Sequence, residues 1–443
     1  MVEANIQIIK ELKYFLETVS QDPEFRKLVV NAEGDFSRKR TLTLERVVAI
    51  IINMPKRSLS AEIKDFFDCL GEGEAQATKG AFSLQRGKLN PFFFTAWNRW
   101  LVRNFYHFYG AEVKRWKGFL LQAVDGSSAY LFDKPKVVAY FGGKANQHGS
   151  TPMARVMQIH DVLNDITVWG GIYPYEKTEN AIIAEQVCNL AIDSLTIFDR
   201  GFPGYGLMYL MINEEVPRHF LMRCKLDFNK ETKAFASSKK SSAIIELTPG
   251  KKAIDMLRAN GYIVTANTKI KVRMVKFKLP SGELEILVTN LYDEQLYSVE
   301  EMKHLYGLRW GIETAYDKQK NQQQMEQFSG HRVICIQQDY AATVFVANLQ
   351  SLIEKQSDNY LEGVNKRRKY KYKINRNLSW ATLKYNIVKL FLIAKPDEIL
   401  LKLQGEFQAH LEPVRPGRHN ERNWKARRLN GKYQTFTNYR RAI

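Results

Sequence analysis

The sequence predicts an α/β fold, a mixed sheet flanked by helices, with a β-rich insertion and helical regions at both ends. Between about residues 117 and 225, short apolar segments alternate with segments of helical periodicity, which is typical of a mixed α/β sheet. The next stretch, 226–296, has mainly β patterning. The 443-residue chain is long enough for two to four domains and a sizeable core.

Helical periodicity dominates the region 1–108. The predicted helices span 5–19, 43–53, 60–70, 78–89 and 92–108. Thr78 is a candidate N-cap of the fourth helix, which carries Lys79, Arg86 and Lys88. A helix, a turn-rich break and a basic helix resemble a helix-turn-helix, although short helix pairs are common. We therefore predict that 1–108 is a helical DNA-binding region.

Two buried strands end in an aspartate in the region 109–225. The apolar segment 118–125 ends at Asp125, and the segment 194–199 ends at Asp199. A hairpin is predicted at 163–165 and a helix over 179–192. Open α/β sheets place functional groups at the carboxyl ends of their strands, so both aspartates are candidate site residues.

The insertion 226–296 contains a predicted hairpin around 280–282. Ser298 and Glu301 then form a capping-box pattern that starts a helix running through Lys320. The apolar segment 337–355 predicts a core helix. The last region, 356–443, is basic, with 20 Lys/Arg against 6 Asp/Glu over residues 361–443.

The charge of the chain points to a polyanionic partner. The formal net charge is +19 and the pI is about 9.5, which favours nucleic acid. Trp380, Trp424, Tyr433, Phe436 and Tyr439 are interleaved with the C-terminal basic residues, which suits phosphate contacts combined with stacking. The four cysteines form no disulfide pattern, no signal peptide is recognisable, and no apolar run is long enough to span a membrane. We therefore expect a cytoplasmic protein.

Three carboxylates form the leading candidate site. Asp125 and Asp199 end buried strands, and Glu313 lies on a helix that can pack beside them. Converging carboxylates suit Mg²⁺ or Mn²⁺, and two such ions can assist an in-line phosphoryl transfer. Each aspartate taken singly is more often a turn or cap residue. Asp161 and Asp165 are weaker candidates because they flank the predicted hairpin.

The helix that begins near Ser298 carries an unusual polar stripe. On an ideal helix Tyr306, Arg309, Glu313 and Lys320 fall within about 60° of each other. Most such stripes are solvated faces, and Arg309 with Glu313 matches an ordinary i,i+4 pair. Alternatively, guanidinium, ammonium and phenol groups beside a metal-bound carboxylate would form a phosphate-binding surface.

These motifs together resemble a known family. The spacing Y-x2-R-x3-E-x6-K, with Asp125 in V-D-G-S and Asp199 in D-R-G-F, resembles the Y-R-E-K signature of DDE transposases in the bacterial insertion-sequence family numbered four. The resemblance covers most of the chain from about residue 40. It implies an RNase H-like catalytic core, here 109–225 and 297–355, interrupted by the β-rich insertion.

The resemblance also implies an activity. It assigns Asp125, Asp199 and Glu313 to the catalytic metal site with two Mg²⁺ (or Mn²⁺) ions, and Tyr306, Arg309 and Lys320 to the DNA phosphate. It implies cut-and-paste transposition through nicking, a hairpin intermediate and strand transfer. The expected partners are transposon terminal repeats, target DNA and a second copy of the chain, with the protein associated with a prokaryotic nucleoid.

The sequence leaves two questions open, the residue that stacks on a flipped base and the choice among related functions. Some relatives use a Trp in the insertion to stack on a flipped base, but residues 200–309 contain none. Trp310 is a candidate for that role, and Tyr292 and Tyr297 are alternatives. The alternative functions are a catalytically inactive DNA-binding protein and a structure-selective nuclease on the same fold.

Overall fold

The computed structural model describes most of the chain. The described residues are 2–38, 40–53, 57–73, 76–146, 149–393 and 395–415. Trp424, Tyr433, Phe436 and Tyr439 therefore lie outside them, while Trp380 is buried in the core. All four cysteines are free. Within the described part of the chain, no helix is both long and apolar enough to cross a membrane.

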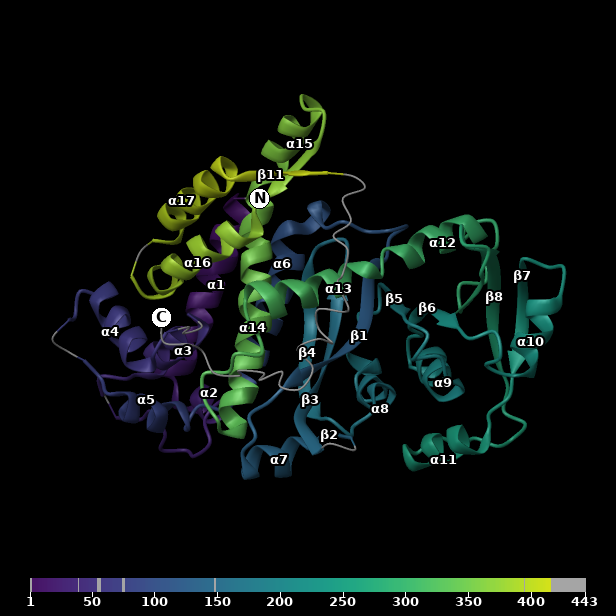
Figure 1. Cartoon of the computed structure of the whole chain (residues 1–443), viewed down its shortest axis with the longest axis horizontal. Helices are drawn as coiled ribbons and strands as arrows, with labels where there is room; N and C mark the ends of the chain where they lie inside the picture. Colours follow the sequence, from purple (N-terminus) through teal and green to yellow (C-terminus); the bar gives the residue numbers. More distant parts are fainter. Residues whose placement is uncertain are drawn as a thin grey trace.

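Six helices form the N-terminal region (Figure 1). They are α1 (Val2–Gln21), α2 (Pro23–Lys27), α3 (Leu44–Ile52), α4 (Leu59–Cys69), α5 (Lys79–Arg86) and α6 (Phe92–Tyr109). The predicted cap of α5 is confirmed, because the Thr78 hydroxyl accepts a hydrogen bond from the Ala81 amide at 3.1 Å. The predicted helix over 78–89 nevertheless ends at Arg86, where the chain turns back to run beside residues 29–31.

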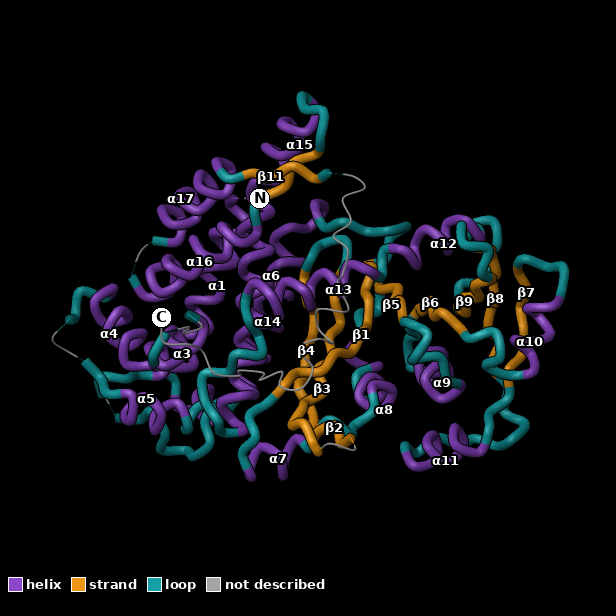
Figure 2. Tube along the Cα trace, viewed as in Figure 1, coloured by secondary structure: helices purple, strands orange, loops and turns teal. Residues whose placement is uncertain are grey.

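The described residues form a nine-stranded mixed sheet, visible in Figure 2. Its strands are β1 (Leu120–Tyr130), β2 (Gly143–Asn146), β3 (Gly149–Asp161), β4 (Ile166–Pro174), β5 (Ser194–Phe198), β6 (His219–Cys224), β7 (Ser242–Leu247), β8 (Ile270–Lys278) and β9 (Leu284–Thr289). Strands β1, β5 and β6 are parallel neighbours, and β3 pairs antiparallel with β1 and β4. The predicted α/β fold with a mixed sheet flanked by helices is confirmed. Across the sheet, these strands follow the order β4-β3-β1-β5-β6.

The insertion continues this sheet. Strand β9 pairs antiparallel with β6, and β8 and β7 follow outward. The predicted hairpin is formed between β8 and β9, with Gly282 at φ 84° in the turn, a conformation that favours glycine. The same region also contains two helices, α10 (Lys230–Ser237) and α11 (Lys251–Ala259).

Helices cover both faces of the sheet. Side chains alternate along a strand, so Leu121 and Ala123 of β1 face one side and Val124 faces the other. The first side is covered by α7 (Pro135–Phe141), α12 (Val299–Gly307), α13 (Trp310–Asp317) and α14 (Val333–Glu354). The second side is covered by α8 (Glu179–Ala184), α9 (Tyr205–Asn213) and α11. The predicted helix 179–192 was too long, because α8 ends at Ala184 and a short 3₁₀ turn, Val187–Asn189, follows.

The N- and C-terminal helices share one hydrophobic core around α14. The C-terminal elements are α15 (Asp358–Lys366), β10 (Lys371–Ile374), α16 (Arg376–Leu392), α17 (Pro396–Ala409) and β11 (Leu411–Val414). The ring of Trp97 on α6 stacks on Phe345 of α14 at 4.0 Å between centroids and lies 5.0 Å from Phe391 of α16. Helix α14 therefore joins the sheet to both terminal regions, as Figure 1 shows.

Candidate active site

The two predicted aspartates are neighbours in the sheet. Asp125 does not end its strand as predicted, because β1 continues along β3 to Tyr130. Val124 and Phe198 are register partners on the parallel strands β1 and β5, so the residues that follow them, Asp125 and Asp199, are neighbours. Neighbouring strands lie about 4.8 Å apart. Both aspartates have the same parity as side chains that face α12, so both belong to the α12–α13 side of the sheet.

The signature segment is not one straight helix. The capping box of Ser298 and Glu301 is confirmed and starts α12, but that helix ends at Gly307. Helix α13 begins at Trp310, and a π-helical turn, Lys318–Gln322, follows it. The prediction of one continuous helix through Lys320 was therefore wrong, although the Arg309 guanidinium still contacts Glu313 and lies 6.0 Å from the centre of the Tyr306 ring.

Tyr306 and Arg309 contact different carboxylates. The Tyr306 hydroxyl donates to Asp199 Oδ1 at 3.1 Å. The Arg309 guanidinium donates to Glu313 Oε1 at 2.6 Å and lies 3.8 Å from Asp125 Oδ2. Arg309 is only 6% exposed, so its pair with Glu313 is not part of a solvated face.

Lys320 lies on the other side of Asp125 along β1. Its Nζ donates to Ser127 Oγ at 2.8 Å and to the Ser128 carbonyl at 2.7 Å, and it is 3.8 Å from Glu326. Burial lowers the pKa of Lys320, and Glu326 opposes that effect. Lys320 therefore joins the π-helical turn to β1 directly beyond Asp125.

The candidate base-stacking residues have different environments. Trp310 is 62% exposed beside the site, and the Arg309 guanidinium lies 5.4 Å from its ring. The Tyr292 hydroxyl donates to the Lys271 carbonyl at 2.7 Å, and the Tyr297 ring packs near Trp116 at 5.8 Å. Trp310 is thus the most accessible of the three aromatic candidates.

The burial of Asp125 sets its acidity. Burial raises the pKa of Asp125 to about 6, against the opposing charge of Arg309 and a hydrogen bond from the Gly126 amide at 2.9 Å. The carboxylates of Glu179 and Asp199 raise it further. Burial and the Asp199 carboxylate together raise the pKa of Tyr306, so its hydroxyl keeps the proton that it donates.

Sequence analysis did not identify Glu179, the first residue of α8. Its side chain lies against Gly126, where an added Cβ would be 2.4 Å from Glu179 Oε1, and it pairs with Arg155 at 2.7 Å. An acid in the first turn of a helix is expected for capping alone, so the sequence carried no signal for this position. Glu179 is a fourth carboxylate near Asp125.

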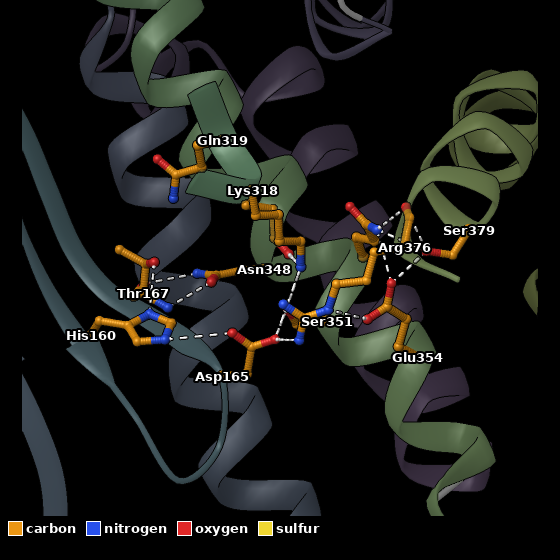
Figure 3. A network of polar contacts seen from close by, with 12 residues as sticks. His160, Asp165, Thr167, Lys318, Gln319, Asn348, Ser351, Glu354, Arg376 and Ser379 are labelled. Atoms are coloured by element: carbon orange, nitrogen blue, oxygen red, sulfur yellow. Dashed lines mark hydrogen bonds and ion pairs between the residues drawn. The ribbon is translucent and has the colours of Figure 1, made fainter. Parts of the chain in front are cut away.

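The two weaker aspartate candidates have structural partners, and Figure 3 shows those of Asp165. Asp165 pairs with Arg376 at 2.9 Å and lies 4.0 Å from Lys318. Although burial opposes its ionisation, these cations hold the pKa of Asp165 well below its usual range. Asp161 accepts hydrogen bonds from the Tyr106 hydroxyl at 2.9 Å and the Asn164 amide at 2.8 Å.

The residues offer suitable donors for a divalent cation, although they do not converge on one point. Three carboxylates are the donor set that Mg²⁺ or Mn²⁺ prefers. The guanidinium of Arg309 lies between Asp125 and Glu313 and shows that this place accommodates positive charge. Within the described residues, no three His, Cys, Asp or Glu side chains lie close enough together to bind one metal ion.

Asp125→Asn is expected to raise the melting temperature at pH 7.5 by about 1–3 °C. Because the folded pKa is about 6, above the ordinary 3.8, ionising Asp125 in the folded protein costs stability as the pH rises through 6. Asparagine removes that cost, and the difference in melting temperature between the variant and the wild type should shrink at pH 4.5. Thermal melts in EDTA at the two pH values measure it, and a lower melting temperature at pH 7.5 would contradict this account.

Comparison with known proteins gives a partial match. No protein-family model matches the sequence. A 134-residue alignment, 28% of this chain, is 26% identical to a protein named "Putative transposase InsZ" from Escherichia coli (strain K12). The chain is similar to a transposase. The alignment spans 43% of that relative, less than half its length.

A solved structure also aligns with the chain. It is the cryo-EM structure of a piggyBac transposase synaptic complex with hairpin DNA, with a TM-score of 0.43 and 10% identity. The alignment covers 98% of this chain and 90% of that chain.

Proposed function

We propose that the protein is a DDE transposase of the bacterial insertion-sequence family numbered four, acting at the prokaryotic nucleoid. The observation that carries the proposal is that Asp125, within β1, and Asp199, directly after β5, are neighbours on parallel strands, on the side of the sheet covered by α12 and α13, the helix of Glu313. The sequence similarity to a transposase supports it. The Y-R-E-K spacing is the basis for proposing this family within that class.

Asp125, Asp199 and Glu313 are the proposed ligands of two Mg²⁺ or Mn²⁺ ions. Bound there, the ions would supply Lewis acidity at the attacking and leaving oxygens of a phosphodiester. Arg309 would have to release Glu313 and Asp125 before those carboxylates converge on a cation. A DNA phosphate is a suitable new partner, because a guanidinium binds phosphate through two parallel hydrogen bonds.

The remaining residues of the signature have proposed roles at the DNA end. Tyr306, Arg309 and Lys320 would contact the terminal phosphate, and the exposed ring of Trp310 could stack on an unpaired base. Lys320 would first exchange its contacts with Ser127 and Ser128. Both of these partners are neutral groups, so the contact with Glu326 at 3.8 Å is the ionic interaction that would change.

The proposed reaction is a sequence of phosphodiester exchanges. Water attacks phosphorus at the transposon end and releases a 3′-hydroxyl, which then attacks the opposite strand to form a hairpin. A second water opens the hairpin, and the 3′-hydroxyl attacks target DNA. Each step forms one P–O bond and breaks another, so no covalent enzyme intermediate is needed. A homodimer would hold both ends together.

The test uses purified protein and DNA that carries the sequences flanking its own coding region. We expect Mg²⁺-dependent cleavage at the element's end, its loss in Asp125→Asn, and joining of the cleaved end to a supercoiled target. Salt-sensitive binding without cleavage would identify an inactive DNA-binding protein. Cleavage at branched DNA without joining would identify a structure-selective nuclease.

A further inference from the structure

A second polar site lies in the N-terminal region, on elements separate from the catalytic edge of the sheet. A cavity of about 320 Å³ opens between the loop that follows α2 and the end of α5. Its lining includes Phe36, Ser37, Arg38, Arg40, Gln85 and Lys88. No acidic side chain of the described residues is part of that lining.

The two walls of the cavity are held together by backbone contacts. Val30 and Leu89 form an antiparallel bridge. The Asn31 amide donates to the Lys88 carbonyl at 2.9 Å, and the Asn31 side chain donates to the Gly87 carbonyl at 2.8 Å. Phe36 packs against the main hydrophobic core. The cavity is therefore preformed.

The two arginines of its lining lack internal compensation. Arg38 and Arg40 are exposed, and neither has an acidic partner among the described residues. Lys88, in contrast, forms an ion pair with Asp35, with 3.7 Å between Nζ and Oδ1. Two unpaired arginines beside one cavity favour an anion, because arginines bind phosphate through paired hydrogen bonds.

A buried amide lies beside these cations. Gln85 is 8% exposed, and its Oε1 is buried with no hydrogen-bond partner in the described structure. A buried polar atom without a partner costs stability, so its retention favours a ligand that supplies a donor. The cavity thus combines an anion-binding wall with a hydrogen-bond acceptor.

Of the three cations that the helix-turn-helix prediction assigned to this segment, Arg86 is not available to a ligand. It is buried and pairs with Asp339 at 2.8 Å. Lys79 remains exposed on α5, and Lys88 lies beyond the end of that helix, in the wall of the cavity. The cavity therefore has two unpaired arginines, whereas Lys79 is the exposed cation of α5.

We propose that this cavity binds a backbone phosphate of nucleic acid, with Gln85 accepting a hydrogen bond from the adjoining nucleotide. The proposal rests on the proposed function in that DNA is the expected partner. A backbone phosphate suits the site because Arg38 and Arg40 are at the surface, where a continuous strand can pass. The cavity volume lies in the range of sites for small groups.

The first test compares two charge-matched variants. Arg38→Gln/Arg40→Gln removes two cations from the cavity, whereas Lys10→Gln/Lys402→Gln removes two exposed cations from α1 and α17. Fluorescence anisotropy with a labelled duplex is measured over a range of salt concentrations. The cavity variant should bind about tenfold more weakly, with a salt slope smaller by about 0.9 for each phosphate that the protein no longer neutralises. The control should keep the wild-type slope.

A second variant tests the amide. Gln85→Leu keeps the side-chain size and removes the unpartnered oxygen, so it should weaken DNA binding a few-fold without lowering the melting temperature. Unchanged binding in both Arg38→Gln/Arg40→Gln and Gln85→Leu would overturn the proposal. A second result would also overturn it. If inorganic phosphate stabilises the wild type but Arg38→Gln/Arg40→Gln binds DNA normally, the cavity binds free phosphate and not DNA.

The outcomes separate this proposal from the proposed function. Cleavage that depends on Asp125, with equal DNA binding by the cavity and control variants, would overturn the cavity proposal alone. Cavity-dependent DNA binding by a protein that never cleaves would support the cavity and overturn the transposase assignment.

Discussion

Glu313→Gln is expected to reduce Mg²⁺-dependent DNA cleavage by about three orders of magnitude. Glutamine keeps the shape of the side chain and an oxygen that can accept the hydrogen bond from Arg309, now made at 2.6 Å. It removes the negative charge that the proposed metal site needs. DNA binding should be retained, since Arg309 loses only its ionic partner.

Asp317→Asn is the matched control for this change. Asp317 is exposed one turn further along α13 and accepts a hydrogen bond from Asn321 at 2.5 Å. This substitution removes the same charge from the same helix, but Asp317 lies outside the proposed ligand set. Cleavage rates and anisotropy are measured for both variants. Full cleavage by Glu313→Gln, or equal losses in the two variants, would remove Glu313 from the catalytic set.

Arg86→Ala is expected to lower the free energy of unfolding by about 3–5 kcal/mol. The side chains of Arg86 and Asp339 are 4% and 3% exposed, and the guanidinium also donates to Gln338 Oε1 at 2.7 Å and the Cys335 carbonyl at 3.0 Å. Truncation would leave the Asp339 charge and these acceptors buried without their partner. Urea unfolding followed by circular dichroism measures the decrease.

Two further variants test whether the loss of stability comes from the buried ion pair. Lys79→Ala removes an exposed cation from the same helix and should change stability by less than about 0.5 kcal/mol. Arg86→Ala/Asp339→Ala should cost less than the sum of its single changes, because the double variant leaves no buried charge unpaired. Additive effects would show that Arg86 acts by packing and not through the ion pair.

Local sequence patterns determined much of the fold. Apolar segments predicted the strands β1 and β5 and hence the shared face of Asp125 and Asp199, although β1 continues past Asp125 to Tyr130. Short-range hydrogen bonds set helix starts, so Thr78 and Ser298 were recognisable as caps. These features depend on residues within a few positions of each other, which is why a single sequence is sufficient.

Long-range packing decided the rest. Arg86 looks like a surface cation in sequence, but its partner Asp339 lies 253 residues away. The proximity of Glu179 to Asp125 depends on α8 lying against β1 at Gly126. Tyr306 and Arg309, close together in sequence, contact Asp199 and Asp125 on different strands of the sheet. Such contacts are chosen by the free energy of burial and charge pairing across the whole chain, so no local periodicity could reveal them.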